Sequence, residues 1–178
     1  MIRKLKSAKP QEAQDAINAE VTQVVSRIIA EVAERGDVAV REYSEKFDKW
    51  NPTSFRLSSK QVAECVAELS KQELDDIRFA QAQVRRFAEA QLSTLSEVEI
   101  ETIPGVILGH KNIPVQSVAC YVPGGKYPLI ASAHMGVVTA KVAGVSRVVA
   151  VAPPFNGKPN PAIVAAMHLG GADEIYCA

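Results

Sequence analysis

The sequence predicts an α/β protein in which a helical N-terminal segment precedes the start of an incomplete, doubly wound parallel sheet. Three observations lead to this class: a shift in composition near residue 103, helical spacing of apolar residues before it, and alternating strand and helix signals after it. Residues 104–178 hold seven of the 40 charged side chains, nine of the ten glycines and eight of the ten prolines. We therefore expect a helical region with the first strand over residues 1–103 and an α/β domain over residues 104–178.

The start of the chain has the apolar spacing of an amphipathic helix. Between residues 11 and 35, apolar residues recur at steps of three and four, which predicts one helix with a buried stripe. Gly36-Asp37 ends this helix, and residues 39–47 form a second, shorter one. The stripe consists of Ala13, Ile17, Val21, Val24, Ile28 and Val32.

Two capping boxes mark later helix starts. Ser58 is followed three residues on by Gln61, and Ser70 by Glu73. In each pair the serine and the longer side chain can satisfy each other's backbone N–H groups. We expect the second of these helices to run to about residue 92.

Strand signals begin at residue 98. Residues 98–103 and 106–108 flank Pro104-Gly105, which predicts two strands around a turn. Residues 147–152 form a near-continuous apolar run, typical of a strand buried on both faces of a parallel sheet. The expected β-α-β-α-β order is strand 117–122, helix 131–143, strand 147–152, a helix from Asn160-Pro161 to Gly170-Gly171, and a strand from Glu174. Because the sheet stops on a bare strand, we expect a fragment of a longer protein.

Composition excludes several classes of protein. The 20 basic and 20 acidic side chains balance, which argues against a nucleic-acid partner. No apolar run approaches the roughly 20 residues that span a bilayer, and no signal peptide is recognisable. The three cysteines lie more than 50 residues apart, which suits neither a disulfide framework nor a metal knuckle. We expect a soluble, cytoplasmic protein without a membrane or nucleic-acid partner.

A glycine-rich turn follows the strand at 117–122. The segment from Tyr121 to Lys126 reads Tyr-Val-Pro-Gly-Gly-Lys and leads into a helix, the usual place for nucleotide phosphates. It is not a P-loop, because Cys120 stands in place of the first glycine and Tyr127 in place of the Ser or Thr after the lysine. Two interpretations stay open here: a ligand contact or a tight turn.

Few other residues are candidates for chemistry. None of the three histidines has metal-ligand spacing to another His, Cys or carboxylate. His134 lies just inside the helix after the turn, so it either faces the site or packs in the interior. Cys120 and Cys177 are expected to be small core residues. With no recognisable acid/base pair, we expect no catalytic residue and no metal ligand in this chain.

Three segments resemble the histidinol dehydrogenase family: residues 120–130, residues 139–154, and the closing Gly-Gly-Ala-Asp-Glu-Ile-Tyr from Gly170. The resemblance implies a Rossmann-like domain without the usual glycine fingerprint, in a homodimeric dehydrogenase that uses NAD and zinc. Such enzymes oxidise a primary alcohol through the aldehyde to the carboxylate. Tyr121 matches an NAD-contacting tyrosine of the family, and Gly124 and Gly125 would let the backbone approach the cofactor. The zinc ligands and catalytic Glu-His pair would lie beyond residue 178.

One departure from the family concerns the substrate. Where histidinol dehydrogenases commonly carry a hydroxyl pair and then Val-Leu-Met, this chain has Ala-Ser-Ala-His-Met at 131–135, so we expect Ser132 and His134 to contact a different alcohol. Residues 77–81, 84–88 and 108–115 are similar to sulfopropanediol dehydrogenases. We therefore expect oxidation of sulfopropanediol to sulfolactate. The alternatives are oxidation of histidinol to histidine and a non-catalytic binding or assembly module.

Overall fold

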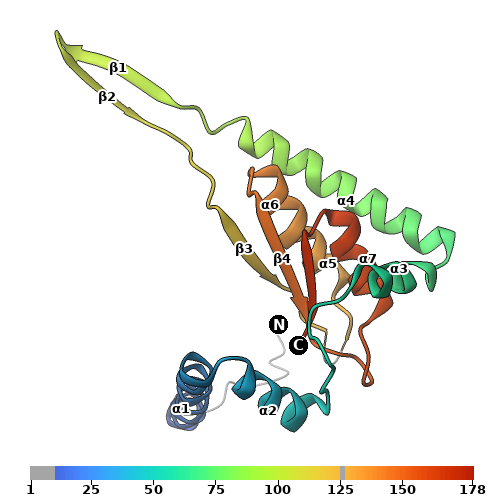
Figure 1. Cartoon of the computed structure of the whole chain (residues 1–178). Coiled ribbons are helices and arrows are strands. Elements are labelled where there is room, and N and C mark those ends of the chain that lie inside the picture. Colours follow the sequence, from blue (N-terminus) through green and yellow to red (C-terminus); the bar gives the residue numbers. More distant parts are fainter. Residues whose placement is uncertain (1–10, 125–126) are drawn as a thin grey trace, which may run out of the picture. The chain divides into compact units, whose positions relative to one another are not determined.

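The computed structural model describes residues 11–124 and 127–178, with side chains from Asn18 onward (Figure 1). Gly125, expected near the cofactor, lies outside the described residues. Packing divides the chain into two compact units, residues 1–47 and 48–178. The division expected at residue 103 is one of composition, and it stays a prediction.

The first unit is made of helix α1 (Gln11–Arg35) and most of helix α2 (Asp37–Asp48). Gly36 separates the two helices with a φ of 55°, a conformation that glycine adopts without steric penalty. The Tyr43 hydroxyl donates to Glu31 Oε2 at 2.8 Å, and the Arg35 guanidinium pairs with the Glu42 carboxylate. These polar contacts join the end of α1 to α2.

The predicted buried stripe of α1 is wrong for this chain. Val21 and Val24 are 55% and 37% exposed, and Ile28 and Val32 are only half-buried. The side chains of Ala13 and Ile17 lie outside the described residues. The helix itself is where the spacing predicts it, but α2, the other helix of its unit, leaves this apolar side largely exposed. Periodicity identifies a helix and its apolar face, whereas burial also needs an opposing surface.

The second unit contains the parallel sheet. Strands β3 (Ser117–Tyr121), β4 (Arg147–Ala152) and β5 (Glu174–Cys177) lie in the order β3-β4-β5. The connection from β3 to β4 contains three consecutive helical segments, α5 (Ile130–Ala133), η1 (His134–Val138) and α6 (Thr139–Val142). Helix α7 (Pro161–Gly170) connects β4 to β5. This confirms the expected β-α-β-α-β order and the α/β class.

One more layer of helix covers these connections. Helix α4 (Lys71–Leu92) packs against η1, α6 and α7, and α3 (Ser59–Ala67) packs against α7 (Figure 1). Both predicted capping boxes are present: Ser58 and Ser70 accept bonds from the backbone N–H groups of Gln61 and Glu73, whose side chains bond back. The chain before α3 pairs with β5, with Leu57 N donating to Ile175 O at 2.9 Å.

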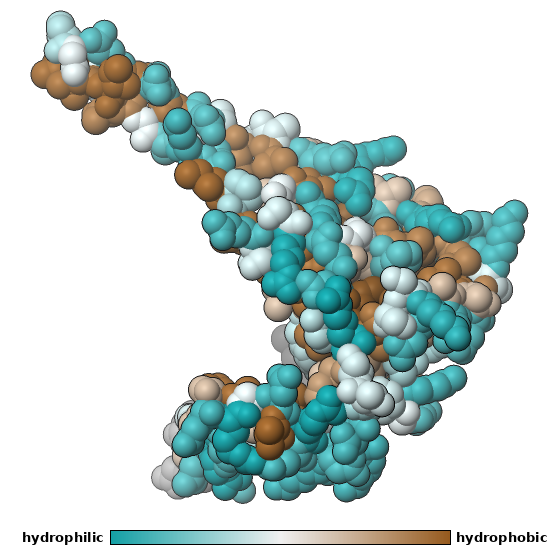
Figure 2. Space-filling view, in the orientation of Figure 1, coloured by the Kyte–Doolittle hydropathy of each residue, from teal (hydrophilic) through white to brown (hydrophobic). Residues whose placement is uncertain are grey.

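Strands β1 (Val98–Ile103) and β2 (Val106–His110) form a separate antiparallel hairpin around Gly105, as predicted. Every residue of both strands is exposed. Figure 2 shows the apolar surface that this hairpin presents. The hairpin therefore contributes no side chain to the described core.

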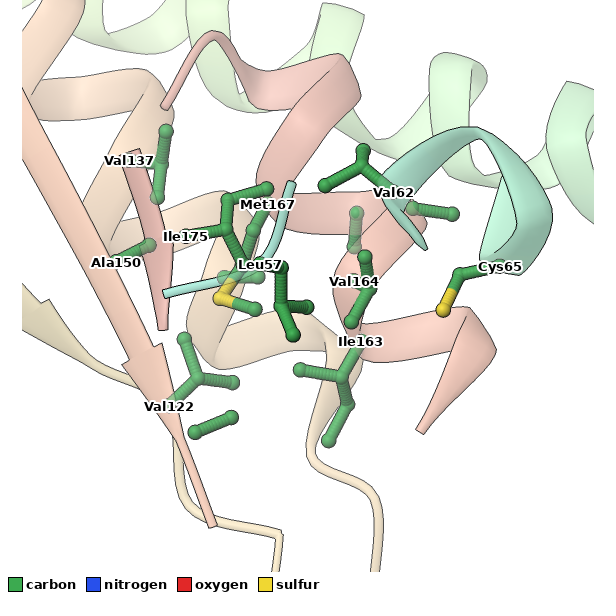
Figure 3. Close-up of a cluster of buried hydrophobic side chains, with 14 of the residues drawn as sticks. Leu57, Val62, Cys65, Val122, Val137, Ala150, Ile163, Val164, Met167 and Ile175 are labelled. Carbon is green, nitrogen blue, oxygen red and sulfur yellow. The ribbon is translucent and has the colours of Figure 1, made fainter. Parts of the chain in front are cut away.

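The core lies between the sheet and the helices (Figure 3). Val148, Ala150 and Ala152 of β4 are buried there against Ile163 and other residues of the helices. The alternate residues of β4, Val149 and Val151, are only half-buried. Burial of this strand on both faces was therefore a wrong expectation for the described chain, because helices cover one face of its sheet.

Replacing Ser70 with alanine tests the capping box of α4. Loss of the hydroxyl leaves the backbone N–H of Glu73 without its acceptor, so we expect Ser70→Ala to lower the free energy of unfolding by about 1 kcal/mol. Chemical denaturation measures this. Ser59→Ala, an exposed position one residue inside α3, serves as the control and is expected to change stability little.

Candidate functional site

The turn after β3 stands at the carboxyl edge of the parallel sheet. Val122 continues the pairing of β3, its N–H donating to Val151 O at 2.8 Å, and the Leu129 N–H donates to Pro123 O. A Cβ on Gly124 would lie 2.9 Å from Ile163 Cδ1 of α7. Glycine at this position thus has a packing reason: it lets the turn lie directly against α7. The carboxyl edge of such a sheet is where ligands of open α/β proteins bind.

Tyr121 closes β3 on the face of the sheet opposite the helices. Its side chain is 62% exposed, and it stands in register with Val151 of β4, which in turn pairs with Tyr176 of β5. The two tyrosines and the valine form one row across the three strands. An exposed aromatic ring beside the carboxyl edge can stack on a planar ligand group, so the geometry permits the cofactor contact expected of Tyr121.

His134 has a different setting, inside the helical layer. It is 6% exposed, and its Nδ1 lies 3.2 Å from Nε2 of Gln81 on α4. The same Gln81 nitrogen donates to Ala166 O of α7 at 2.8 Å. Because the amide nitrogen can only donate, Nδ1 accepts and the ring proton resides on Nε2. His134 is thus largely buried in the helical layer, while it also lines a pocket described below.

Burial sets the charge of this histidine. Desolvation lowers the pKa of His134, since a charged imidazolium loses hydration that the interior does not replace. The neutral ring also suits the hydrogen bond from Gln81, which an imidazolium could not accept. His134 is therefore a neutral donor at Nε2 near neutral pH.

Ser132 and His134 do not converge on one place. Ser132 is half-buried and stands two residues before His134, so the two side chains leave different sides of the helix. Their expected roles as substrate contacts stay predictions. Gln81, which sequence reasoning missed, is the residue that contacts His134. The signal was a polar residue on the buried side of α4, four residues after Ile77.

His134 begins a turn of π-helix, a rare form often found near functional sites. The neighbouring Gly136 faces β3: a Cβ there would lie 3.4 Å from Cys120 Cβ. The glycine lets η1 lie close to the strand while His134 reaches α4. This short segment therefore ties the sheet to the outer helical layer.

A pocket of about 290 Å³ opens beside His134. It lies between the start of α4 and the starts of α5 and α7. Leu69, Ile77, Ile130 and Ala162 form its apolar walls, and Glu73 and Asp76 add two carboxylates. The described residues thus contain two places of interest: the open edge at Tyr121 and this histidine-lined pocket.

Neither a metal cluster nor an activated thiol occurs in the described part of the chain. No three His, Cys, Asp or Glu side chains there come together in a way that could hold a metal ion. Burial raises the pKa of the Cys177 thiol to about 12, and it also raises the pKa of Cys120. Cys177 is a buried core residue and the half-buried Cys120 packs against the core, as expected.

The fold places this chain in the class of α/β proteins whose parallel sheet has an open carboxyl edge, the edge at which Tyr121 lies. The family model described as histidinol dehydrogenase matches residues 11–178, and the chain belongs to the histidinol dehydrogenase family. A crystal structure of histidinol dehydrogenase from Elizabethkingia anophelis superposes with a TM-score of 0.81 at 26% identity, covering 99% of this chain and 38% of that one. This confirms both the family resemblance and the fold class.

Curated relatives carry two kinds of name. The chain is 52% identical to a histidinol dehydrogenase homolog 1 of Mesorhizobium japonicum, over 99% of this chain and 35% of the relative. It is 45% identical to a sulfopropanediol 3-dehydrogenase of Ruegeria pomeroyi, over 98% of this chain and 40% of the relative. A histidinol dehydrogenase of Methanosarcina mazei is 34% identical, over 99% and 42%. The chain therefore spans about two fifths of the length of these relatives.

Removing the Gln81 side chain tests how much the buried amide contributes. Gln81→Ala leaves Ala166 O and His134 Nδ1 without their donor in the interior, so we expect stability to fall by about 2–3 kcal/mol. Urea denaturation provides the measurement. Gln83→Ala, on the exposed side of the same helix, is the matched control, and an equal loss in both variants would contradict the assignment.

The lowered pKa of His134 predicts a pH dependence of stability. The unfolded histidine binds a proton near pH 6.5 and the folded one only at lower pH, so its contribution is complete above about pH 6.5 and is lost as the pH falls through the folded value. This contribution makes the free energy of unfolding lower at about pH 5.5 than at about pH 8. We expect His134→Gln to make the difference between these two pH values smaller. Gln83→Ala, which removes no histidine, should leave that difference unchanged.

Proposed function

We propose that this chain is part of an NAD-linked, zinc-dependent dehydrogenase that oxidises a primary alcohol through the aldehyde to the carboxylate. Membership of the histidinol dehydrogenase family supports the dehydrogenase class. The proposed substrate is sulfopropanediol, with sulfolactate as the product. The observation that carries this choice is the 45% identity to a sulfopropanediol 3-dehydrogenase, against 34% and 35% to histidinol dehydrogenases of Methanosarcina mazei and Lactiplantibacillus plantarum.

Tyr121 is the proposed NAD contact within this chain, with Gly124 and Gly125 as backbone neighbours of the cofactor. The exposed tyrosine ring at the carboxyl edge supports this role, since it offers a planar surface that the described helices of its own unit leave open. For Gly124, the close approach of Ile163 is a sufficient reason for glycine, and the cofactor contact is an additional proposal.

Zinc has no fitting donor set among the described residues. We place its ligands, and the acid/base residues, in the part of the relatives that this chain does not span. When bound, zinc would polarise the alcohol oxygen. The described residues of this chain would contribute cofactor binding to the reaction.

The proposed assembly is a homodimer, and the proposed location is the cytoplasm. Exposed apolar residues of α1, such as Val21 and Ile29 at 55% and 63%, support a protein partner for this helix. In the described part of the chain, no helix has the length and hydropathy needed to cross a membrane. Sedimentation of the complete protein tests the dimer.

Histidinol is the second candidate substrate, because the family model and several relatives carry that name. Parallel assays of the complete protein with NAD and zinc on sulfopropanediol and on histidinol discriminate the two. We expect a much larger kcat/KM for sulfopropanediol. Faster oxidation of histidinol would overturn the substrate assignment, and oxidation of neither would overturn the proposed function.

Substituting Tyr121 tests the cofactor site. Loss of the ring in Tyr121→Ala removes the stacking surface, so we expect the Kd for NAD to rise about tenfold. Tyr121→Phe keeps the ring and should stay near the unsubstituted value. Isothermal titration of the complete protein measures both, and Tyr43→Ala in the first unit is the control.

A further inference from the structure

We propose that the pocket beside His134 is a second small-molecule site, which binds an organic ammonium ion with an apolar body and a hydrogen-bond acceptor. The pocket lies on the helix-covered side of the sheet, whereas Tyr121 lies on the opposite face. The inference needs neither NAD nor the alcohol, and it assigns His134 to this ligand in place of the expected contact with the alcohol.

The first support is the unused donor of His134. Gln81 occupies Nδ1, and the structure records no second hydrogen bond of this ring among the described residues. In that part of the chain, every fully buried side-chain nitrogen or oxygen has a partner. Nε2 is therefore not fully buried, and we assign its exposed side to the pocket that His134 lines. A ligand with an oxygen or nitrogen acceptor can take this hydrogen bond.

The second support is the charge at the pocket. Glu73 accepts from the backbone N–H and hydroxyl of Ser70 at 2.8 and 2.7 Å, and these bonds lower the pKa of its carboxyl group. Asp76 accepts from Nε2 of Gln72 at 2.8 Å. None of the recorded ion pairs of the described residues includes either carboxylate, although other acidic residues nearby, such as Asp75 with Arg78, are paired. Two carboxylates without a cation favour a cationic ligand.

The third support is shape and lining. Four apolar side chains form the walls, and the volume of about 290 Å³ is near the lower end of small-molecule sites, roughly 300 Å³. Such a pocket suits a ligand with one ring or a short alkyl body. The ligand that matches this lining is an arylalkylamine or alkylamine that carries a hydroxyl or carbonyl oxygen. Its body would contact the apolar wall, its ammonium group the two carboxylates, and its oxygen the N–H donor.

Three probes of matched size test the proposal by isothermal titration of the protein. Tyramine carries the ammonium, the ring and an acceptor oxygen. Phenethylamine lacks the acceptor, and 3-(4-hydroxyphenyl)propionate replaces the ammonium with a carboxylate. We expect saturable binding of tyramine, weaker binding of phenethylamine and none of the propionate. Equal binding of all three, or no binding of tyramine, would overturn the proposal.

Charge-neutral variants locate the site. Glu73→Gln keeps a capping-box side chain, and Asp76→Asn keeps an acceptor for Gln72, so the fold is preserved. We expect the double variant to raise the Kd for tyramine about tenfold, since two exposed ion pairs with the ammonium are lost. Asp75→Asn, on the same helix but outside the pocket, is the matched control and should not change the affinity.

Three outcomes distinguish failure of this proposal from failure of the dehydrogenase assignment. If tyramine binds but the double variant binds it equally well, the site lies elsewhere and the proposal fails. If tyramine does not bind because another segment of the protein fills the pocket, the proposal also fails, while NAD binding and alcohol oxidation would be unaffected. Loss of oxidation with retained tyramine binding would overturn only the dehydrogenase assignment.

Discussion

The second unit depends on one buried polar contact, the bridge that Gln81 makes between helices. One amide nitrogen joins α4 to η1 through His134 and to α7 through Ala166 O. Inside a low-dielectric layer, such a bridge stabilises the fold only when each of its donors and acceptors is hydrogen-bonded. The bridge therefore favours one placement of α4 over the helices of the sheet. The pocket beside His134 exists because this placement brings the start of α4 against the starts of α5 and α7.

A second constraint is that, in the second unit, the described helices cover one face of the parallel sheet. Helices bury alternate residues of β4, and the other face carries the row of Tyr121, Val151 and Tyr176. A parallel sheet normally has both faces covered, and the relatives are more than twice as long as this chain. The exposed Tyr121 is therefore consistent with a site that further elements complete.

The features that could be predicted from the sequence are those that depend on residues close together in the chain. The capping boxes at Ser58 and Ser70, the turn at Gly105 and the helix after Asn160 are each determined by residues within four positions. All of them form as expected. The buried stripe of α1 and the two-sided burial of β4 are the expectations that failed, and both concern surfaces that a distant part of a protein must supply.

The same distinction between nearby and distant residues applies to the candidate site. Motifs alone led to the turn after β3 and to the family, because the order of aromatic, proline and glycine residues there is specific. They could not show that His134 contacts Gln81, because the two residues lie 53 positions apart in the sequence. Thus the sequence by itself determined the elements and their order, through local hydrogen bonds and periodicity, and it indicated the family through the resemblance of its motifs. Only the tertiary structure decided which faces are buried and which side chains meet, because those depend on contacts between distant segments.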